Sequence, residues 1–98
     1  MKFDVETTDI FERWFRSIGN RQFGARILTR IDQIRRGNFG DRKNVGRDLF
    51  ELRFFFGSGY RIYYTVRSGT VVLLLCGGDK SSQQRDIKRA KEIVAKLK

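Results

Sequence analysis

Apolar residues recur at intervals of three and four along three stretches of the chain, which predicts three amphipathic helices. The apolar stripes are Ile10, Phe11, Trp14, Phe15 and Ile18; Phe23, Ile27, Ile31 and Ile34; and Ile87, Ala90, Ile93, Val94 and Leu97. Trp14 lies within the first stripe, so we expect it to pack in the core rather than to stack on a ligand.

Capping residues stand at the ends of these stretches. The expected N-terminal caps are Asp9 with Glu12, Asn20, and Ser81 with Gln84. Gly19 and Gly37 are expected to end the first two helices. The short connection between those helices favours an antiparallel helical hairpin.

Four shorter segments have the pattern of strands. Residues 2–6 alternate weakly, residues 49–56 and 60–66 flank a Gly57-Ser58-Gly59 turn, and residues 71–76 are apolar on both faces. The last of these is therefore expected inside the sheet. Residues 37–48 are charged and rich in turn formers, which predicts a loop. The order β-α-α-β-β-β-α predicts one α/β domain of the α+β type over residues 1–98. We expect its mostly antiparallel sheet to be packed by helices on one face.

The hairpin places a group of polar residues on one face of this sheet. Pairing that is symmetric about Ser58 sets Arg53 opposite Tyr63 and Phe55 opposite Arg61. Glu51 joins them, while the other face is apolar and is expected against the helices. An exposed sheet face bearing arginine and tyrosine suits a polyanion with stackable bases. An ordinary solvated face is the alternative interpretation.

Composition and charge narrow the class of partner. The chain has 98 residues and an apolar share of 40%, which is enough for a small core. Its net charge of +10 indicates a nucleic acid, an anionic membrane surface or an acidic protein as partner, and solubility alone is the alternative explanation. The arginines on helix faces, Arg26 and Arg30 among them, are expected to be solvated charges. The longest apolar run is too short to span a membrane.

Cysteine and histidine usage limits the chemistry further. The single cysteine, Cys76, forms no intrachain disulfide, and together with the absence of a secretory pattern it favours the cytoplasm. We expect Cys76 to be a core residue. With no histidine and one cysteine the sequence has no metal-site spacing, and it has no histidine acid or base, so no metal or other cofactor is expected.

Three ordered motifs resemble the RelE/ParE superfamily of bacterial toxins, most of all its branch of HigB-like addiction module killer proteins. They are Glu51-Leu52-Arg53; Gly57-x-Gly59 with Tyr60-Arg61-Ile62-Tyr63-Tyr64; and Gly77-Gly78-Asp79-Lys80-Ser81 with Gln83, Asp86, Ile87 and Ala90. The sequence departs from this branch at Ser58, where proline is common, and this bears on the rigidity of the turn.

The resemblance implies a microbial-ribonuclease-like RelE fold and a toxin of a type II toxin–antitoxin system that cleaves mRNA, in many members on the ribosome. It also implies an oligomeric assembly with an antitoxin, in this branch usually a helix-turn-helix protein. A ParE-like inhibitor of DNA gyrase and an inactive nucleic-acid-binding module are the alternatives. The cluster around Arg61 favours the ribonuclease, since gyrase binding alone does not require it.

A metal-free ribonuclease activates the ribose 2′-OH, stabilises a pentacoordinate phosphorus and protonates the leaving 5′-oxygen. Arg53 and Arg61 suit the stabilisation of charge, because guanidinium groups match phosphate oxygens. Lys80 is the better candidate for proton transfer, and Tyr63 either stacks on a base or shares a proton. Glu51 is either a base or, as we prefer, a partner that orients Arg53 or Arg61 beside the RNA. Gln83 either contacts a phosphate or, as we prefer, caps the last helix.

Overall fold

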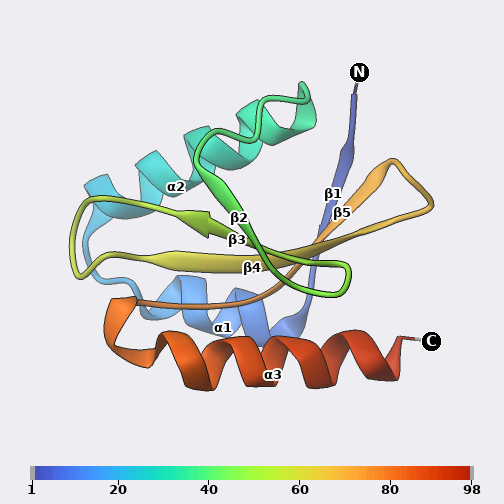
Figure 1. The fold of residues 1–98 in the computed structure, drawn as a ribbon. Helices are drawn as coiled ribbons and strands as arrows, with labels where there is room; N and C mark the ends of the chain where they lie inside the picture. Colours follow the sequence, from blue (N-terminus) through green and yellow to red (C-terminus); the bar gives the residue numbers. More distant parts are fainter. Residues whose placement is uncertain (1, 98) are drawn as a thin grey trace.

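The computed structural model describes residues 2–97, which form a five-stranded sheet and three α-helices (Figure 1). Strand β1 runs parallel to β5, and all other neighbours in the order β1-β5-β4-β3-β2 are antiparallel. The elements are β1 (Asp4–Thr7), α1 (Asp9–Ser17), α2 (Arg21–Arg35), β2 (Arg42–Gly46), β3 (Leu49–Arg53), β4 (Arg61–Arg67), β5 (Val71–Gly78), the 3₁₀ turn η1 (Lys80–Ser82) and α3 (Gln83–Lys96). The α+β class and the interior position of β5 are confirmed. None of the described helices is long and apolar enough to cross a membrane.

Strand β2 lies in the segment for which a loop was expected. It pairs antiparallel with β3, with Arg42 opposite Leu52, and it forms an edge of the sheet. Charged residues are typical of edge strands, because they discourage pairing with another chain. The sequence RKNVG therefore lacks the apolar alternation by which an interior strand is recognised.

Two of the three helix caps differ from the prediction. Thr8 rather than Asp9 caps α1, since its hydroxyl accepts a hydrogen bond from the Phe11 N–H at 3.0 Å and donates to the Leu75 carbonyl at 2.6 Å. Before α3 the capping box is formed by Asp79 and Ser82 around η1, not by Ser81 and Gln84. Asn20 caps α2 as predicted.

Helices cover both faces of the sheet, so the prediction of helices on one face is wrong. Helices α1 and α2 pack on one face, against a core that includes Leu52, Ile62 and Tyr64. Helix α3 packs on the opposite face, over Tyr63 and Leu75 (Figure 1). The face that was expected to be exposed is therefore largely buried beneath α3. The apolar stripe of α3 needs a sheet face to pack on, and the other face is already covered by α1 and α2.

The hairpin register is shifted by two residues from the predicted one. Arg53 pairs with Arg61, and Glu51 pairs with Tyr63. The Phe54 N–H donates to the Tyr60 carbonyl at 3.0 Å and the Gly59 N–H donates to the Phe56 carbonyl at 3.1 Å. Between these two bonds Phe55 is an extra residue with no counterpart on the β4 side, as in a β-bulge. A shift of two preserves parity, so Glu51, Arg53, Arg61 and Tyr63 still share a face. The predicted pairing of Phe55 with Arg61 is wrong, because Phe55 has no partner on β4.

Arg30 is a structural residue and not the solvated charge that was expected. Its guanidinium donates to the backbone carbonyls of Phe39, Asp41 and Arg53 and lies 4.7 Å from the centre of the Phe54 ring. Partial burial lowers the pKa of Arg30 from its ordinary value, with the Asp41 charge opposing that shift. Arg30 thus ties α2 to the segment before β2 and to the end of β3.

Cys76 is expected to be unreactive in the folded protein. It is buried beneath α3, and burial raises the pKa of its thiol to about 12. Only the thiolate attacks alkylating reagents, so at pH 8 the native thiol stays protonated and shielded. Incubation with iodoacetamide at pH 8, followed by mass spectrometry, should leave the native chain unmodified and alkylate it fully in guanidinium chloride. Alkylation at equal rates in both conditions would contradict this burial.

Candidate active site

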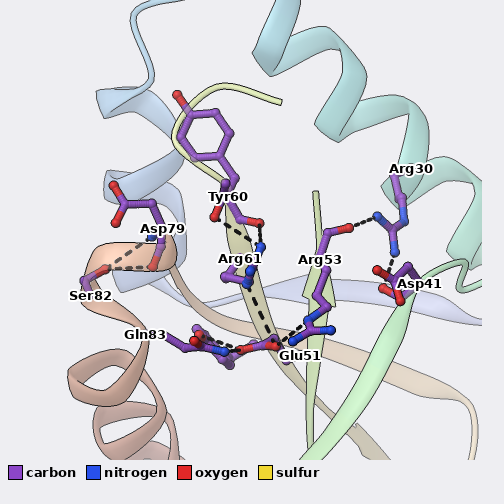
Figure 2. A network of polar contacts seen from close by, with 11 residues as sticks. Arg30, Asp41, Glu51, Arg53, Tyr60, Arg61, Asp79, Ser82 and Gln83 are labelled. Carbon is purple, nitrogen blue, oxygen red and sulfur yellow. Dashed lines mark hydrogen bonds and ion pairs between the residues drawn. The ribbon is translucent and has the colours of Figure 1, made fainter. Parts of the chain in front are cut away.

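Glu51 is the centre of a cluster of polar side chains at one end of the sheet (Figure 2). Its carboxylate is fully buried. Oε2 accepts hydrogen bonds from the Tyr63 hydroxyl at 3.0 Å and from Gln83 Nε2 at 2.8 Å. Oε1 accepts from Arg53 Nε at 3.2 Å and lies 3.9 Å from Arg61 Nε. Arg53, Arg61, Tyr63 and Gln83 were all singled out from the sequence. Their side chains lie around the carboxylate of a fifth such residue, Glu51.

The sheet register and the start of α3 bring these side chains together. Arg53 and Arg61 are paired neighbours on β3 and β4, and Glu51 is paired with Tyr63 two residues along. Since side chains two apart in a strand share a face, all four point toward α3. Gln83, the first residue of α3, completes the cluster by donating to Glu51. Its side chain binds Glu51, so the capping role that we preferred for it is wrong.

Hydrogen bonds hold the Arg61 guanidinium in place, but they do not use all of its donors. Its Nη1 donates to the carbonyls of Gly59 and Tyr60, both at 3.3 Å, and only 7% of the residue is exposed. Nε has no hydrogen-bond partner within residues 2–97, because Glu51 lies beyond hydrogen-bond distance. A single carboxylate thus faces two guanidinium groups, and the cluster keeps one excess positive charge. Such a site favours an anion, since a buried charge is costly unless it is compensated.

Tyr63 is wholly buried, which leaves no ring face on which a base can stack. Burial raises the pKa of its phenol well above the ordinary value, and the Glu51 carboxylate raises it further. Tyr63 therefore stays protonated in the neutral range and donates its proton to Glu51. Tyr64 and Tyr60 pack in the core on the opposite face of the sheet.

Lys80 lies beside this cluster on the exposed turn η1. A Cβ at Gly59 would lie 3.3 Å from the Lys80 Cβ and 3.8 Å from Arg61 Nη1, so the glycine allows the two segments to approach closely. The Lys80 ammonium forms no ion pair among the described residues. Together with Ser81 and Gln83 it lines a hollow of about 490 Å³. Of the predicted site residues, Lys80 alone does not touch Glu51.

Two carboxylates that the sequence left without a role hold this turn. The Asp79 carboxylate accepts hydrogen bonds from the N–H and the hydroxyl of Ser81, at 2.9 and 2.5 Å. The hydroxyl bond from Ser81 is the main reason that the pKa of Asp79 lies below its ordinary value. Asp86, buried on α3, accepts a hydrogen bond from the Ser82 hydroxyl. The capping spacing of Asp79 and Ser82 is the one sequence signal that could have revealed this arrangement.

Two further hollows were not predicted. One of about 500 Å³ lies beside α1 and is lined by Trp14, Tyr60 and three arginines, although Trp14 also packs on the core as expected. The other, also about 500 Å³, lies between α2 and the end of β3. Among the residues that line it are Arg26, Arg53 and Phe55.

Comparison with known proteins identifies the family of the chain. The family of phage-derived Gp49-like proteins matches residues 13–98. An uncharacterized protein of Haemophilus influenzae is 44% identical over 97 residues, which cover 99% of this chain and 98% of that protein.

Solved structures extend the likeness to the fold. The free E. coli toxin RelE superposes with a TM-score of 0.73 at 16% identity, covering 95% of this chain and 99% of RelE. The toxin–antitoxin complex RelBE2 of Mycobacterium tuberculosis contains a chain with a TM-score of 0.63 at 20% identity, covering 82% of this chain and 100% of that one. The chain therefore belongs to the family of phage-derived Gp49-like proteins and has the fold of the RelE toxins, as the motifs predicted.

Proposed function

We propose that the protein is the toxin of a toxin–antitoxin pair and that it cleaves mRNA without a metal ion. The observation that carries this proposal is the pair Arg53 and Arg61, which share one buried carboxylate and so present an excess positive charge. The RelE fold and membership of the Gp49-like family support the toxin assignment.

The residues divide into those that contact RNA and those that position them. Arg61 and Arg53 bind the scissile phosphate and stabilise the negative charge of the pentacoordinate state. Lys80, exposed on the turn beside them, transfers a proton to or from the reacting oxygens. Glu51 positions the arginines, and Tyr63 and Gln83 hold its carboxylate. Tyr63 is not a base in this scheme, because its raised pKa keeps it protonated.

The partners follow from charge and from the solved relatives. A net charge of +10 suits mRNA and the ribosome, and it also suits an antitoxin with an acidic contact surface. The RelBE2 structure holds a toxin with its antitoxin, which supports a similar assembly here. We propose that this antitoxin is a helix-turn-helix protein and that the pair acts in the cytoplasm.

Cell-free translation of a defined mRNA tests the function. Purified protein should cleave the message, and primer extension should map new 5′ ends inside the coding region. Preincubation with the antitoxin should prevent the cleavage. Intact message together with trapped, cleaved DNA in a gyrase assay would instead identify a gyrase inhibitor. Intact message without effect on gyrase would identify an inactive binding module.

A further inference from the structure

Phe55 is an exposed aromatic side chain in an otherwise well-packed hairpin. It is 81% exposed, whereas its neighbour Phe54 is 3% exposed. Phe56, on the other side, packs against Phe23 with ring centres 5.1 Å apart. Because Phe55 is the extra residue of the hairpin, its side chain turns outward while both neighbours turn inward. A lone apolar side chain at a surface needs no function in general, so its surroundings decide its meaning.

Those surroundings form a basic hollow that shares one residue, Arg53, with the proposed active site. Arg53 both contacts Glu51 and lines the hollow of about 500 Å³ in which Phe55 lies. Figure 2 shows Arg61 on one side of Arg53, and Arg30 with Asp41 on the other. The Arg26 guanidinium lies at the same hollow, 4.2 Å from the centre of the Phe56 ring. The hollow therefore combines an exposed ring with cationic side chains next to the proposed phosphate site.

The hairpin segment that carries Phe55 is held rigidly by its neighbours. Arg30 donates to the Arg53 carbonyl and stacks on Phe54, while Phe56 contacts Tyr60 and Phe23. A ring that is held on a rigid support loses little conformational entropy when a ligand stacks on it. Single-stranded nucleic acids are bound in this way, by aromatic rings for the bases and by a basic groove for the backbone.

We propose that Phe55 is a stacking platform for an RNA base next to the scissile phosphate. Arg26 then faces the sugar–phosphate backbone of the RNA beside that base. This inference rests on the proposed ribonuclease function and adds a subsite to it. The charge of the hollow favours RNA over an apolar protein segment as its occupant.

Binding of a short single-stranded RNA, with 2′-O-methyl groups to prevent cleavage, tests the subsite by fluorescence anisotropy. Phe55→Ala should weaken binding roughly 5- to 150-fold, and Phe55→Trp should retain it, since stacking needs a ring. Leu28→Ala is the matched control, because Leu28 is 54% exposed on α2, and it should change nothing.

An abasic nucleotide beside the scissile position identifies the partner of the ring. The wild type should lose affinity for abasic RNA, whereas Phe55→Ala should bind intact and abasic RNA equally. Equal affinity of Phe55→Ala and Leu28→Ala for intact RNA would overturn the stacking role while cleavage by the wild type upheld the function. Loss of antitoxin binding alone in Phe55→Ala would assign the ring to the antitoxin and also overturn it. If the wild type neither binds nor cleaves RNA, the proposed function itself fails.

Discussion

Replacement of Glu51 by alanine is expected to abolish RNA cleavage and to lower the free energy of unfolding by about 3–5 kcal/mol. The carboxylate is fully buried and is the common partner of Arg53, Arg61, Tyr63 and Gln83. Without it, Arg61 is left as a buried charge that has lost its carboxylate partner, and the phenol and the amide lose their acceptor. Urea denaturation followed by circular dichroism measures the stability, and the translation assay measures the activity.

Glu51→Gln separates the charge of this side chain from its shape. The amide fills the same volume and still offers one acceptor oxygen, so we expect a smaller loss of stability than in Glu51→Ala. Cleavage should nevertheless fall strongly, because the charge that aligns both guanidinium groups is gone. Glu92→Ala removes an exposed acidic side chain on α3. It serves as the control and should behave as wild type. A Glu51→Ala protein as stable and active as that control would refute the role of Glu51.

Replacement of Arg61 by alanine is expected to reduce the cleavage rate by roughly 10²–10³-fold, as for the loss of a donor that stabilises transition-state charge. Arg61 supplies the buried guanidinium whose Nε lacks a hydrogen-bond partner among residues 2–97. The rate is measured under single-turnover conditions in the translation assay. Circular dichroism checks that the variant is folded.

Two further variants test whether the loss of rate is specific to the guanidinium group of Arg61. Arg61→Lys keeps the charge but not the fork of donors, so it should recover only part of the lost rate. Arg67→Ala removes an exposed arginine at the far end of the same strand and should leave the rate unchanged. If Arg61→Ala and Arg67→Ala cleaved equally well, Arg61 would have no part in the chemistry.

Much of the fold follows from hydrophobic periodicity, and the reasons for its failures are physical. The three helices and the interior strand β5 were predictable because each has an apolar pattern of its own. Strand β2 was not, since an edge strand satisfies part of its backbone with water and needs no apolar alternation. The cover that α3 provides was also missed, because the stripe of a helix does not reveal which sheet face it meets.

The sequence indicated which residues form the candidate site, but not how they are arranged in it. Strand parity alone placed Glu51, Arg53, Arg61 and Tyr63 on one face, and it survived the error in register. Parity does not report depth, so the burial of Tyr63 and the central place of Glu51 became visible only in the fold. The outward turn of Phe55 depends on one unmatched residue in the hairpin, and the three consecutive phenylalanines give no sign of it.

The central claim is that this arginine cluster cleaves RNA through the ribose 2′-OH, and the ends of the products test it most directly. Attack by the 2′-OH leaves a 2′,3′-cyclic phosphate on one fragment and a 5′-OH on the other. Mass spectrometry of the fragments from wild-type protein should find these ends, and a 2′-deoxy substitution at the cleaved position should block the reaction. Fragments with 3′-OH and 5′-phosphate ends, or unimpeded cleavage at the deoxy position, would contradict it.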